Sequence, residues 1–326
     1  MQKITGVLFL FLFTVTAAAQ LPAYKNAALP IEERVTDLLQ RMTPEEKFWQ
    51  LFMIPGDLDN ATPQQYQHGL FGFQVSAATK SEGASQQLLQ YNTKENAVLL
   101  ATKINSLQKY FTQDTRLGIP LLIFDEALHG LVREGATAFP QAIGLAASFD
   151  TVLMHSVAKA IAAESRQRGI RQILSPVVNI ASDVRWGRTE ETYGEDPYLC
   201  SAMAVAYVSE LEKAGIISTP KHFLANVGDG GRDSYPIHWN ERLLKEIYLP
   251  PFKACFELGG SRSVMTAYNS IDGSPATASK WLLQDVLKKE YGFNGFVISD
   301  ASAVGGANVL HYTAADYADA SKRALQ

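Results

Sequence analysis

The sequence is poor in cysteine and in charge. Only Cys200 and Cys255 occur in 326 residues, and neither stands in a CxxC or cysteine–histidine spacing. A disulfide framework and a structural zinc site are therefore both disfavoured. Charged residues make up 19% of the chain, with 29 lysines and arginines against 33 aspartates and glutamates. Because no basic block interrupts this balance, the sequence predicts no nucleic-acid partner.

Several motifs of cofactor and metal enzymes are also missing. The cluster at 228–231 (Gly-Asp-Gly-Gly) lacks the GxGxxG order of a dinucleotide site, and no P-loop is present. The chain has neither a GxSxG nucleophile motif nor histidines in the HExxH spacing. A nicotinamide-dependent oxidoreductase, a serine hydrolase and a zinc protease are thus disfavoured. We expect no cofactor and no metal.

The first residues have the three parts of a secretory signal. Lys3 precedes an apolar run from Val7 to Val15, and three alanines at 17–19 form a small-residue cleavage site. The run is shorter than the roughly 20 apolar residues that span a bilayer, so no membrane anchor is predicted. We expect a signal peptide at residues 1–19, a mature domain at 20–326, and a secreted or periplasmic protein.

The remaining chain alternates short apolar runs with longer helical patterns, which predicts a mainly parallel α/β sheet with crossover helices. The number of units favours a (β/α)₈ TIM-type barrel over an open doubly wound sheet. Predicted strands lie at 71–75, 121–126, 172–177, 215–222, 263–269 and 295–300, and predicted helices at 43–52, 95–110, 152–168, 199–213, 242–258 and 280–291.

The end of the sequence predicts an incomplete barrel. After Asp300 the chain offers a loop and then a helical pattern at 314–326 with no glycine or asparagine to end it. No further strand pattern follows. We therefore expect the chain to be truncated before the barrel closes.

Polar residues follow several predicted strands, which is where barrel enzymes place their chemistry. Asp300 ends the apolar run 296–299, and the run 121–124 ends in Asp125 and Glu126. Each of these carboxylates has a plain alternative role as the cap of a following helix. The neighbours Lys221 and His222 have fewer such explanations, because burial of either polar side chain is energetically unfavourable. We expect both to donate hydrogen bonds to hydroxyl groups.

Arginines and an aromatic residue complete the set. Arg188 precedes an acidic stretch at 190–196, for which a surface salt-bridge network is the alternative interpretation. Arg232 follows the glycine cluster, and Tyr268 follows the apolar run 264–267. Carboxylates with many donors suit a polyhydroxylated ligand. Hydrolysis of a glycoside requires two carboxyl groups, one as the acid and the other as the nucleophile or base.

These residues stand in motifs that resemble a known family. The motifs are Glu126-Ala-Leu-His129-Gly130, Arg185-Trp-Gly-Arg188 with Tyr193-Gly-Glu-Asp196-Pro197, Lys221-His222-Phe223, Met265-Thr-Ala-Tyr268-Asn269 and Val297-Ile-Ser-Asp300. Together and in this order, they resemble the N-terminal domain of glycoside hydrolase family 3 from about Leu38 onward. The family includes β-glucosidases and β-xylosidases.

The resemblance implies roles for individual residues. It makes Asp300 the nucleophile that forms a covalent glycosyl-enzyme, with retention at the anomeric carbon. It also implies that the terminal non-reducing sugar is held by the following residues: Glu126, Arg188, Lys221, His222, Arg232 and Tyr268. Cations around Asp300 are expected to keep it ionised. The implied activity is an exported exo-β-glucosidase acting on oligosaccharides or other β-glycosides.

Two alternatives stay open at this point. Glu126 stands where β-glucosidases of the family often carry aspartate, and glutamate there is more typical of the xylosidase-type members. In most of the family the acid/base belongs to a second, α/β-sandwich domain, which the sequence ends before reaching. The fragment alone is thus expected to be nearly inactive, and a non-catalytic sugar-binding remnant is the second alternative. Oligomeric state is left open.

Overall fold

The computed structural model describes residues 21–59, 61–62, 64–79, 89–92 and 95–326. The predicted signal peptide at 1–19 lies outside these residues. The chain divides into two compact units with the boundary between Phe48 and Trp49. All predicted site residues belong to the second unit.

The first unit is helical. It contains the 3₁₀ turn η1 (Ala23–Lys25), α1 (Ile31–Arg41) and the start of α2 (Pro44–Trp49). The start of α2 is a capping box. Glu46 N–H donates to Thr43 Oγ1 at 3.2 Å, and Thr43 N–H donates to Glu46 Oε2 at 2.9 Å. This reciprocal pair confirms the helix start predicted at Thr43.

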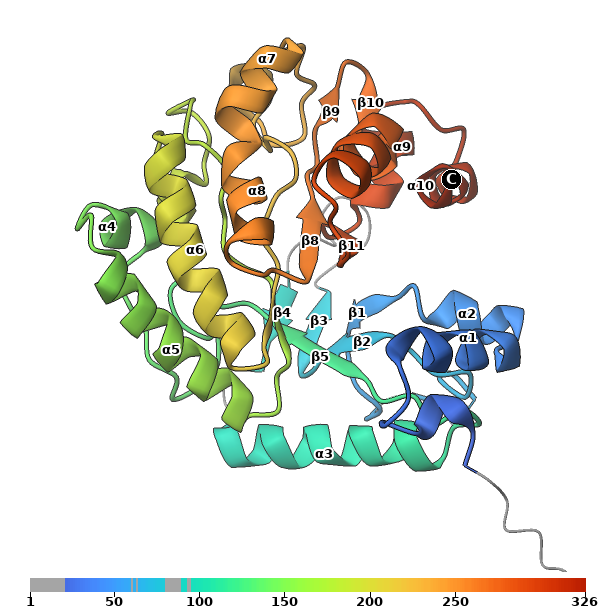
Figure 1. Cartoon of the computed structure of the whole chain (residues 1–326). Coiled ribbons are helices and arrows are strands. Elements are labelled where there is room, and N and C mark those ends of the chain that lie inside the picture. Colours follow the sequence, from blue (N-terminus) through green and yellow to red (C-terminus); the bar gives the residue numbers. More distant parts are fainter. Residues whose placement is uncertain (1–20, 60, 63, 80–88, 93–94) are drawn as a thin grey trace, which may run out of the picture. The chain divides into compact units, whose positions relative to one another are not determined.

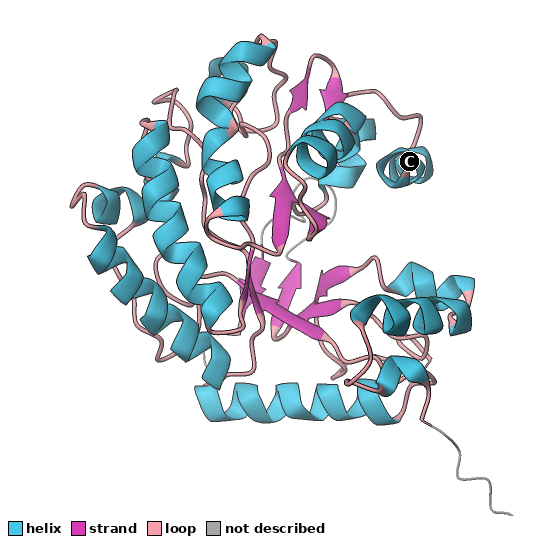
Figure 2. Ribbon diagram, viewed as in Figure 1, coloured by secondary structure: helices cyan, strands magenta, loops and turns pink. Residues whose placement is uncertain are grey.

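Parallel strands form the centre of the second unit (Figures 1 and 2). One sheet has the order β1-β2-β5-β6-β7, and a separate parallel pair joins β8 to β11. The strands are β1 (Met53–Pro55), β2 (Gly72–Gln74), β5 (Leu122–Asp125), β6 (Gln172–Ile173), β7 (Ile217–Ser218), β8 (Ser263–Thr266) and β11 (Phe296–Ser299). Two further pairs of strands are antiparallel: β3 (Ala77–Thr79) with β4 (Leu89–Tyr91), and β9 (Ser270–Ile271) with β10 (Ser274–Pro275).

The two groups of parallel strands share one interior. A parallel bridge between Phe223 and Thr266 joins the chain after β7 to β8. A cluster of buried apolar side chains gathers residues from four strands and from the position just after β6: Phe124, Leu174 and Met265, with Met53 and Ile298 packed against them. The mixed α/β fold with parallel strands is therefore confirmed. Closure into a TIM-type barrel stays a prediction, since β1 and β11 are not paired with each other among the described strands.

Helices cover the outer side of these strands (Figure 1). The helices of the second unit are α3 (Ala97–Gln113), α4 (Ala142–Ala146), α5 (Thr151–Gln167), α6 (Pro197–Lys213), α7 (Glu241–Leu243), α8 (Pro250–Glu257), α9 (Ala303–Val309) and α10 (Tyr317–Leu325), with shorter η3 (Thr189–Glu191), η4 (Asp229–Gly231) and η6 (Ala276–Ala278). Side-chain caps fix several helix starts: at the start of α5, Asp150 accepts from Val152 N–H and Leu153 N–H at 2.9 Å. The main apolar core lies between the helices and the strands.

Two predicted helices differ from the structure. The single helix expected at 242–258 is α7, then a π-helical turn η5 (Leu244–Tyr248), then α8. Two prolines at 250 and 251 lack N–H donors, so the regular helical ladder is interrupted there. The helix expected at 280–291 is the π-helical segment η7 (Trp281–Glu290). Among the described residues, no helix combines the length and apolar character needed to cross a bilayer.

Candidate active site

The predicted site residues follow the carboxyl ends of neighbouring parallel strands. Glu126 comes directly after β5, and Asp300 comes directly after β11. Tyr268 lies two residues beyond the end of β8, and Lys221 and His222 follow β7 through Thr219 and Pro220. Because parallel strands end at the same edge, short apolar strands that terminate in polar side chains bring these groups together.

Lys221 and Glu126 form a largely buried ion pair. Lys221 Nζ donates to both carboxylate oxygens of Glu126, at 3.2 Å to Oε1 and 2.9 Å to Oε2. The lysine side chain is 5% exposed and the glutamate side chain 25% exposed. The pair joins the end of β5 to the segment after β7, so two residues 95 positions apart are held at one edge of the sheet.

Asp300 lies beside this pair with one carboxylate oxygen satisfied and the other not. Its Oδ1 accepts a hydrogen bond from Ala301 N–H at 2.7 Å. Its Oδ2 accepts none from the described residues, although the residue is only 9% exposed. His222 Nε2 lies 3.5 Å from Oδ2. An unpartnered, buried carboxylate oxygen is expected where a nucleophile awaits an electrophilic carbon.

Burial raises the pKa of Asp300 from 3.8 to about 6. The charges of Lys221 and Arg188, the Ala301 N–H and the Tyr268 hydroxyl lower the pKa, but they do not outweigh burial. The surrounding cations thus act in the predicted direction, whereas the prediction left out the desolvation of the carboxylate. At neutral pH a carboxyl group with this pKa is still mostly ionised, as a nucleophile requires.

His222 is buried and held by Asn179. Its main-chain N–H donates to Asn179 Oδ1 at 2.8 Å, its Nδ1 lies 2.9 Å from the same oxygen, and its carbonyl oxygen accepts from Asn179 Nδ2 at 2.9 Å. Burial, and then the charges of Arg188 and Lys221, lower the pKa of His222 well below its usual value. The imidazole is therefore neutral at physiological pH.

Arg188 enters the site from the loop after β6. Its guanidinium binds Glu191 through two parallel hydrogen bonds of 2.8 Å, and its charge lowers the pKa of Asp300. The salt-bridge alternative is thus met in part, because Arg188 pairs with one residue of the acidic stretch, although both side chains are partly buried. Exposed Arg185 pairs with Asp183, which lies outside that stretch.

Tyr268 borders Asp300 from the end of β8. Its hydroxyl donates to Ala301 O at 3.1 Å, and its carbonyl oxygen lies 2.8 Å from His311 Nε2. Burial, and secondly the charge of Asp300, raise the pKa of Tyr268. The phenol therefore stays protonated and serves as a hydrogen-bond donor next to the carboxylate.

Arg232 is not brought into this cluster. Its side chain is exposed and makes no hydrogen bond or ion pair with the described residues. The next residue, Asp233, is partly buried, and its charge raises the pKa values of Arg188 and Tyr268. Sequence reasoning missed Asp233 and Asn179. For Asn179 a signal existed, because it is a polar residue at the end of the apolar run after β6.

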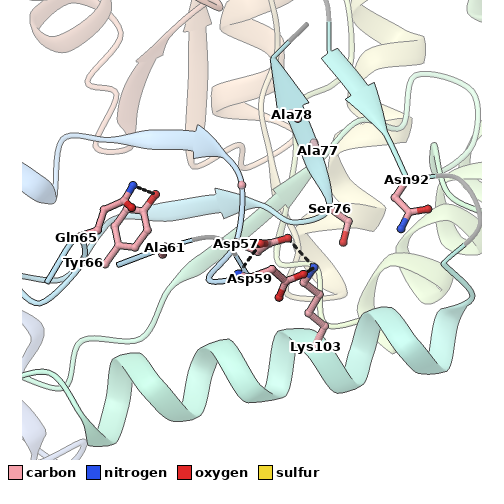
Figure 3. A pocket seen from close by; sticks show the side chains of 11 residues that line it. Asp57, Asp59, Ala61, Gln65, Tyr66, Ser76, Ala77, Ala78, Asn92 and Lys103 are labelled. Carbon is pink, nitrogen blue, oxygen red and sulfur yellow. Dashed lines mark hydrogen bonds and ion pairs between the residues drawn. The ribbon is translucent and has the colours of Figure 1, made fainter. Parts of the chain in front are cut away.

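A separate cavity of about 570 Å³ opens beside the carboxyl ends of β1 and β2 (Figure 3). Lys103 reaches into it from α3 and pairs with Asp57 at 2.6 Å and with Asp59 at 2.7 Å. None of the predicted site residues is among the described residues that line it. Within the described part of the chain, no three histidine, cysteine or acidic residues group together as a metal site would need.

The raised pKa of Asp300 predicts a pH-dependent stability. The folded state holds the proton more tightly than the unfolded chain, so stability falls as the pH rises from about 4 to about 6. Asp300→Asn has no buried carboxylate to ionise, so it avoids this loss of stability. We expect the variant to match the wild type below about pH 4 and to exceed it by about 3 kcal/mol above about pH 6.

Urea unfolding at the two pH extremes measures the difference. Asp272→Asn is a suitable control, because Asp272 is exposed and, among the residues that the structure describes, its carboxylate pairs only with exposed His238, at 3.3 Å. A gain of equal size at both pH values for Asp300→Asn would contradict the assignment to ionisation.

The fold and the site together define an α/β protein with a carboxylate, cations and aromatic groups at the carboxyl edge of its parallel strands. Residues 43–326 match the family model described as the glycosyl hydrolase family 3 N terminal domain. The chain therefore belongs to glycoside hydrolase family 3.

Relatives and solved structures agree with this membership. A β-xylosidase from Formosa agariphila is 35% identical over 76% of this chain, and a periplasmic β-glucosidase from Salmonella typhimurium is 33% identical over 90%. A β-glucosidase from Erythrobacter marinus superposes with a TM-score of 0.78 at 32% identity over 93% of this chain. The chain spans 36% of the length of the first two proteins and 40% of the third.

Proposed function

We propose that this chain supplies the nucleophile and the sugar pocket of an exported, retaining exo-β-glycosidase. Its substrates are oligosaccharides or other glycosides with a terminal, non-reducing β-D-glucosyl residue. The observation that carries the proposal is Asp300, a buried carboxylate with one unpartnered oxygen beside Lys221 and Arg188. Solved complexes of a related Listeria innocua β-glucosidase with glucose and isofagomine support a sugar ligand.

In the first step Asp300 Oδ2 attacks the anomeric carbon. The bond from that carbon to the leaving-group oxygen breaks, its electron pair stays with the oxygen, and a general acid protonates it. In the second step water attacks the same carbon, a general base takes the proton, and the carbon–Asp300 ester bond breaks. Two inversions give net retention.

Neither Glu126 nor Glu191, the carboxylates beside Asp300, is assigned as the general acid/base residue. Glu126 is held by Lys221, and Glu191 is held by Arg188, so each is committed to a cation. This fits the family resemblance, which places the acid/base in a separate α/β-sandwich domain. Departure of a poor leaving group without general acid assistance is slower by about 10²–10⁴-fold. Activated leaving groups need no such help.

A β-xylosidase is the second candidate. The glutamate at position 126 and the Formosa agariphila relative both favour it. Glucose and xylose differ by a hydroxymethyl group, and a pocket of fixed size discriminates such a group by about 10–200-fold. The ratio of rates on the two sugars therefore decides between the candidates.

The test is covalent trapping on this chain. A dinitrophenyl β-glucoside with fluorine in place of the 2-hydroxyl forms the glycosyl-enzyme without an acid and releases it slowly. We expect intact mass to increase by one fluoroglucosyl group and peptide mapping to place it on Asp300. The matching fluoroxyloside should label more slowly by at least about tenfold.

Each outcome is informative. Faster labelling by the xyloside selects the xylosidase candidate. An adduct on a carboxylate other than Asp300 contradicts the proposed nucleophile. Sugar binding without any adduct from either reagent favours the non-catalytic sugar-binding alternative.

Two further proposals accompany the function. We infer that the parallel strands belong to a TIM-type barrel, because Met53 of β1 and Ile298 of β11 pack against one shared interior cluster. Export is proposed from the signal-like pattern of residues 1–19, which lie outside the described residues. Fractionation of cells that express the chain, with and without residues 1–19, tests the export proposal.

A further inference from the structure

The amide orientation of Asn179 is fixed by the main chain of His222. The His222 N–H is a donor, so the atom 2.8 Å from it must be the amide oxygen. The His222 carbonyl oxygen is an acceptor, so the atom 2.9 Å from it must be the amide nitrogen. A flipped amide would place donor against donor and acceptor against acceptor. The usual ambiguity of an asparagine is therefore removed at this position.

This orientation determines which nitrogen of His222 carries the proton. Nδ1 lies 2.9 Å from Asn179 Oδ1, an oxygen that only accepts hydrogen bonds. Nδ1 must therefore be the protonated nitrogen. A neutral imidazole has one protonated nitrogen, so Nε2 presents a lone pair. Asn179 bonds to both the main chain and the ring of His222, and the two residues are each about 1% exposed. The imidazole ring therefore has little freedom to rotate.

We propose that Asn179 is a positioning residue that holds His222 in the Nδ1-protonated tautomer, so that Nε2 accepts a hydrogen bond from a hydroxyl group of the bound sugar. The inference rests on the proposed function for the identity of the ligand. It replaces the sequence-based expectation that Lys221 and His222 are both donors.

The surroundings of Nε2 fit this role. It faces Asp300 Oδ2 at 3.5 Å, and that oxygen accepts no hydrogen bond from the described residues. Two acceptors facing each other are satisfied only by an incoming donor. A sugar hydroxyl is such a donor, and it is an acceptor as well.

The neighbouring lysine completes the recognition of a hydroxyl. Lys221 Nζ offers only donors, and Nε2 of His222 offers only an acceptor. A hydroxyl group satisfies both at once, whereas a carboxylate or an ammonium group satisfies one and opposes the other. Adjacent residues of opposite hydrogen-bonding character therefore select neutral polyols over charged ligands.

Nitrogen NMR of the whole chain with ¹⁵N-labelled histidine rings tests the tautomer directly. The chain has six histidines, and loss of one set of signals in His222→Gln identifies the ring. In the wild type at neutral pH we expect His222 to show a protonated Nδ1 and an unprotonated Nε2. A protonated Nε2 in the wild type overturns the proposal, whatever the activity.

Glucose is the probe for the second part of the proposal, that Nε2 of His222 accepts a hydrogen bond from a sugar hydroxyl. Saturating glucose should shift the Nε2 resonance of His222 toward the position of a hydrogen-bonded acceptor while Nδ1 stays protonated. An unchanged Nε2 resonance, or protonation of Nε2, contradicts the accepting role. Covalent trapping is a separate measurement. An Nδ1-protonated His222 without an adduct on Asp300 would contradict the proposed function, and the tautomer assignment would still hold.

Asn179→Ala tests the positioning role. We expect a mixture of the two His222 tautomers and kcat/KM for a dinitrophenyl β-glucoside lower by about tenfold, the loss of about one hydrogen bond. Asn308→Ala is the matched control, because Asn308 also binds main-chain groups, donating to Ala314 O and Ala315 O at 3.0 Å, away from His222. An Asn179 variant that keeps the wild-type tautomer contradicts the proposal.

Discussion

Replacing Asp300 with glycine is expected to lower kcat on a dinitrophenyl β-glucoside by about 10⁴-fold or more. The variant lacks the oxygen that would form the bond to the anomeric carbon, and the neighbouring carboxylates of Glu126 and Glu191 are each bound to a cation. Because a dinitrophenolate leaves without protonation, the rate reports on the nucleophile alone. The measurement is release of dinitrophenol at saturating substrate.

Chemical rescue separates a missing nucleophile from a damaged fold. Glycine leaves space beside Ala301 for a small anion such as azide. We expect azide to restore part of the rate and to give a glycosyl azide of inverted configuration, since one displacement replaces two. Asp272→Asn, an exposed site where the left-handed backbone (φ 49°) tolerates asparagine, should keep the wild-type rate. A slow Asp300 variant without inverted azide product would indicate a structural defect.

The strands that carry the site residues were predictable because a short, local sequence pattern defines each of them. The runs at 121–126 and 295–300 are short, apolar and terminated by a carboxylate, and β5 and β11 lie within them. β1 is three residues long and ends in Pro55, too short for a periodic pattern, and it was missed. The predicted tail helix begins later, at Tyr317, because Asp316 accepts from Asp319 N–H and caps it there.

The polar contacts that hold the site were less predictable. Lys221 reaches Glu126 across 95 positions, and His222 reaches Asn179 across 43, so tertiary packing rather than local pattern makes these pairs. The sequence predicted cations around Asp300 but could not weigh them against burial, which depends on the finished fold. For the same reason it could not distinguish exposed Arg232 from its neighbour Asp233, whose charge acts on Arg188.

Replacing Lys221 with methionine is expected to lower kcat/KM on the dinitrophenyl β-glucoside by about 100-fold. Methionine keeps the apolar stem of the side chain but removes the proposed donor to the sugar and a charge that lowers the pKa of Asp300. The acid limb of the pH–rate profile should therefore move to higher pH. Lys213→Met is the matched control, since Lys213 also pairs with a glutamate at 2.8 Å but its side chain is 66% exposed.

The ion pair of Lys221 with Glu126 allows the roles in stability and in catalysis to be separated. Lys221→Met alone leaves a partly buried carboxylate without its partner, which costs about 2 kcal/mol of unfolding free energy after allowance for its exposure. Adding Glu126→Gln removes that unpaired charge, so the double variant should regain most of the stability. It should not regain activity, because the proposed donor to the sugar and the charge that acts on Asp300 are still absent. Recovery of both together would assign Lys221 a purely structural role and would contradict its placement in the sugar pocket.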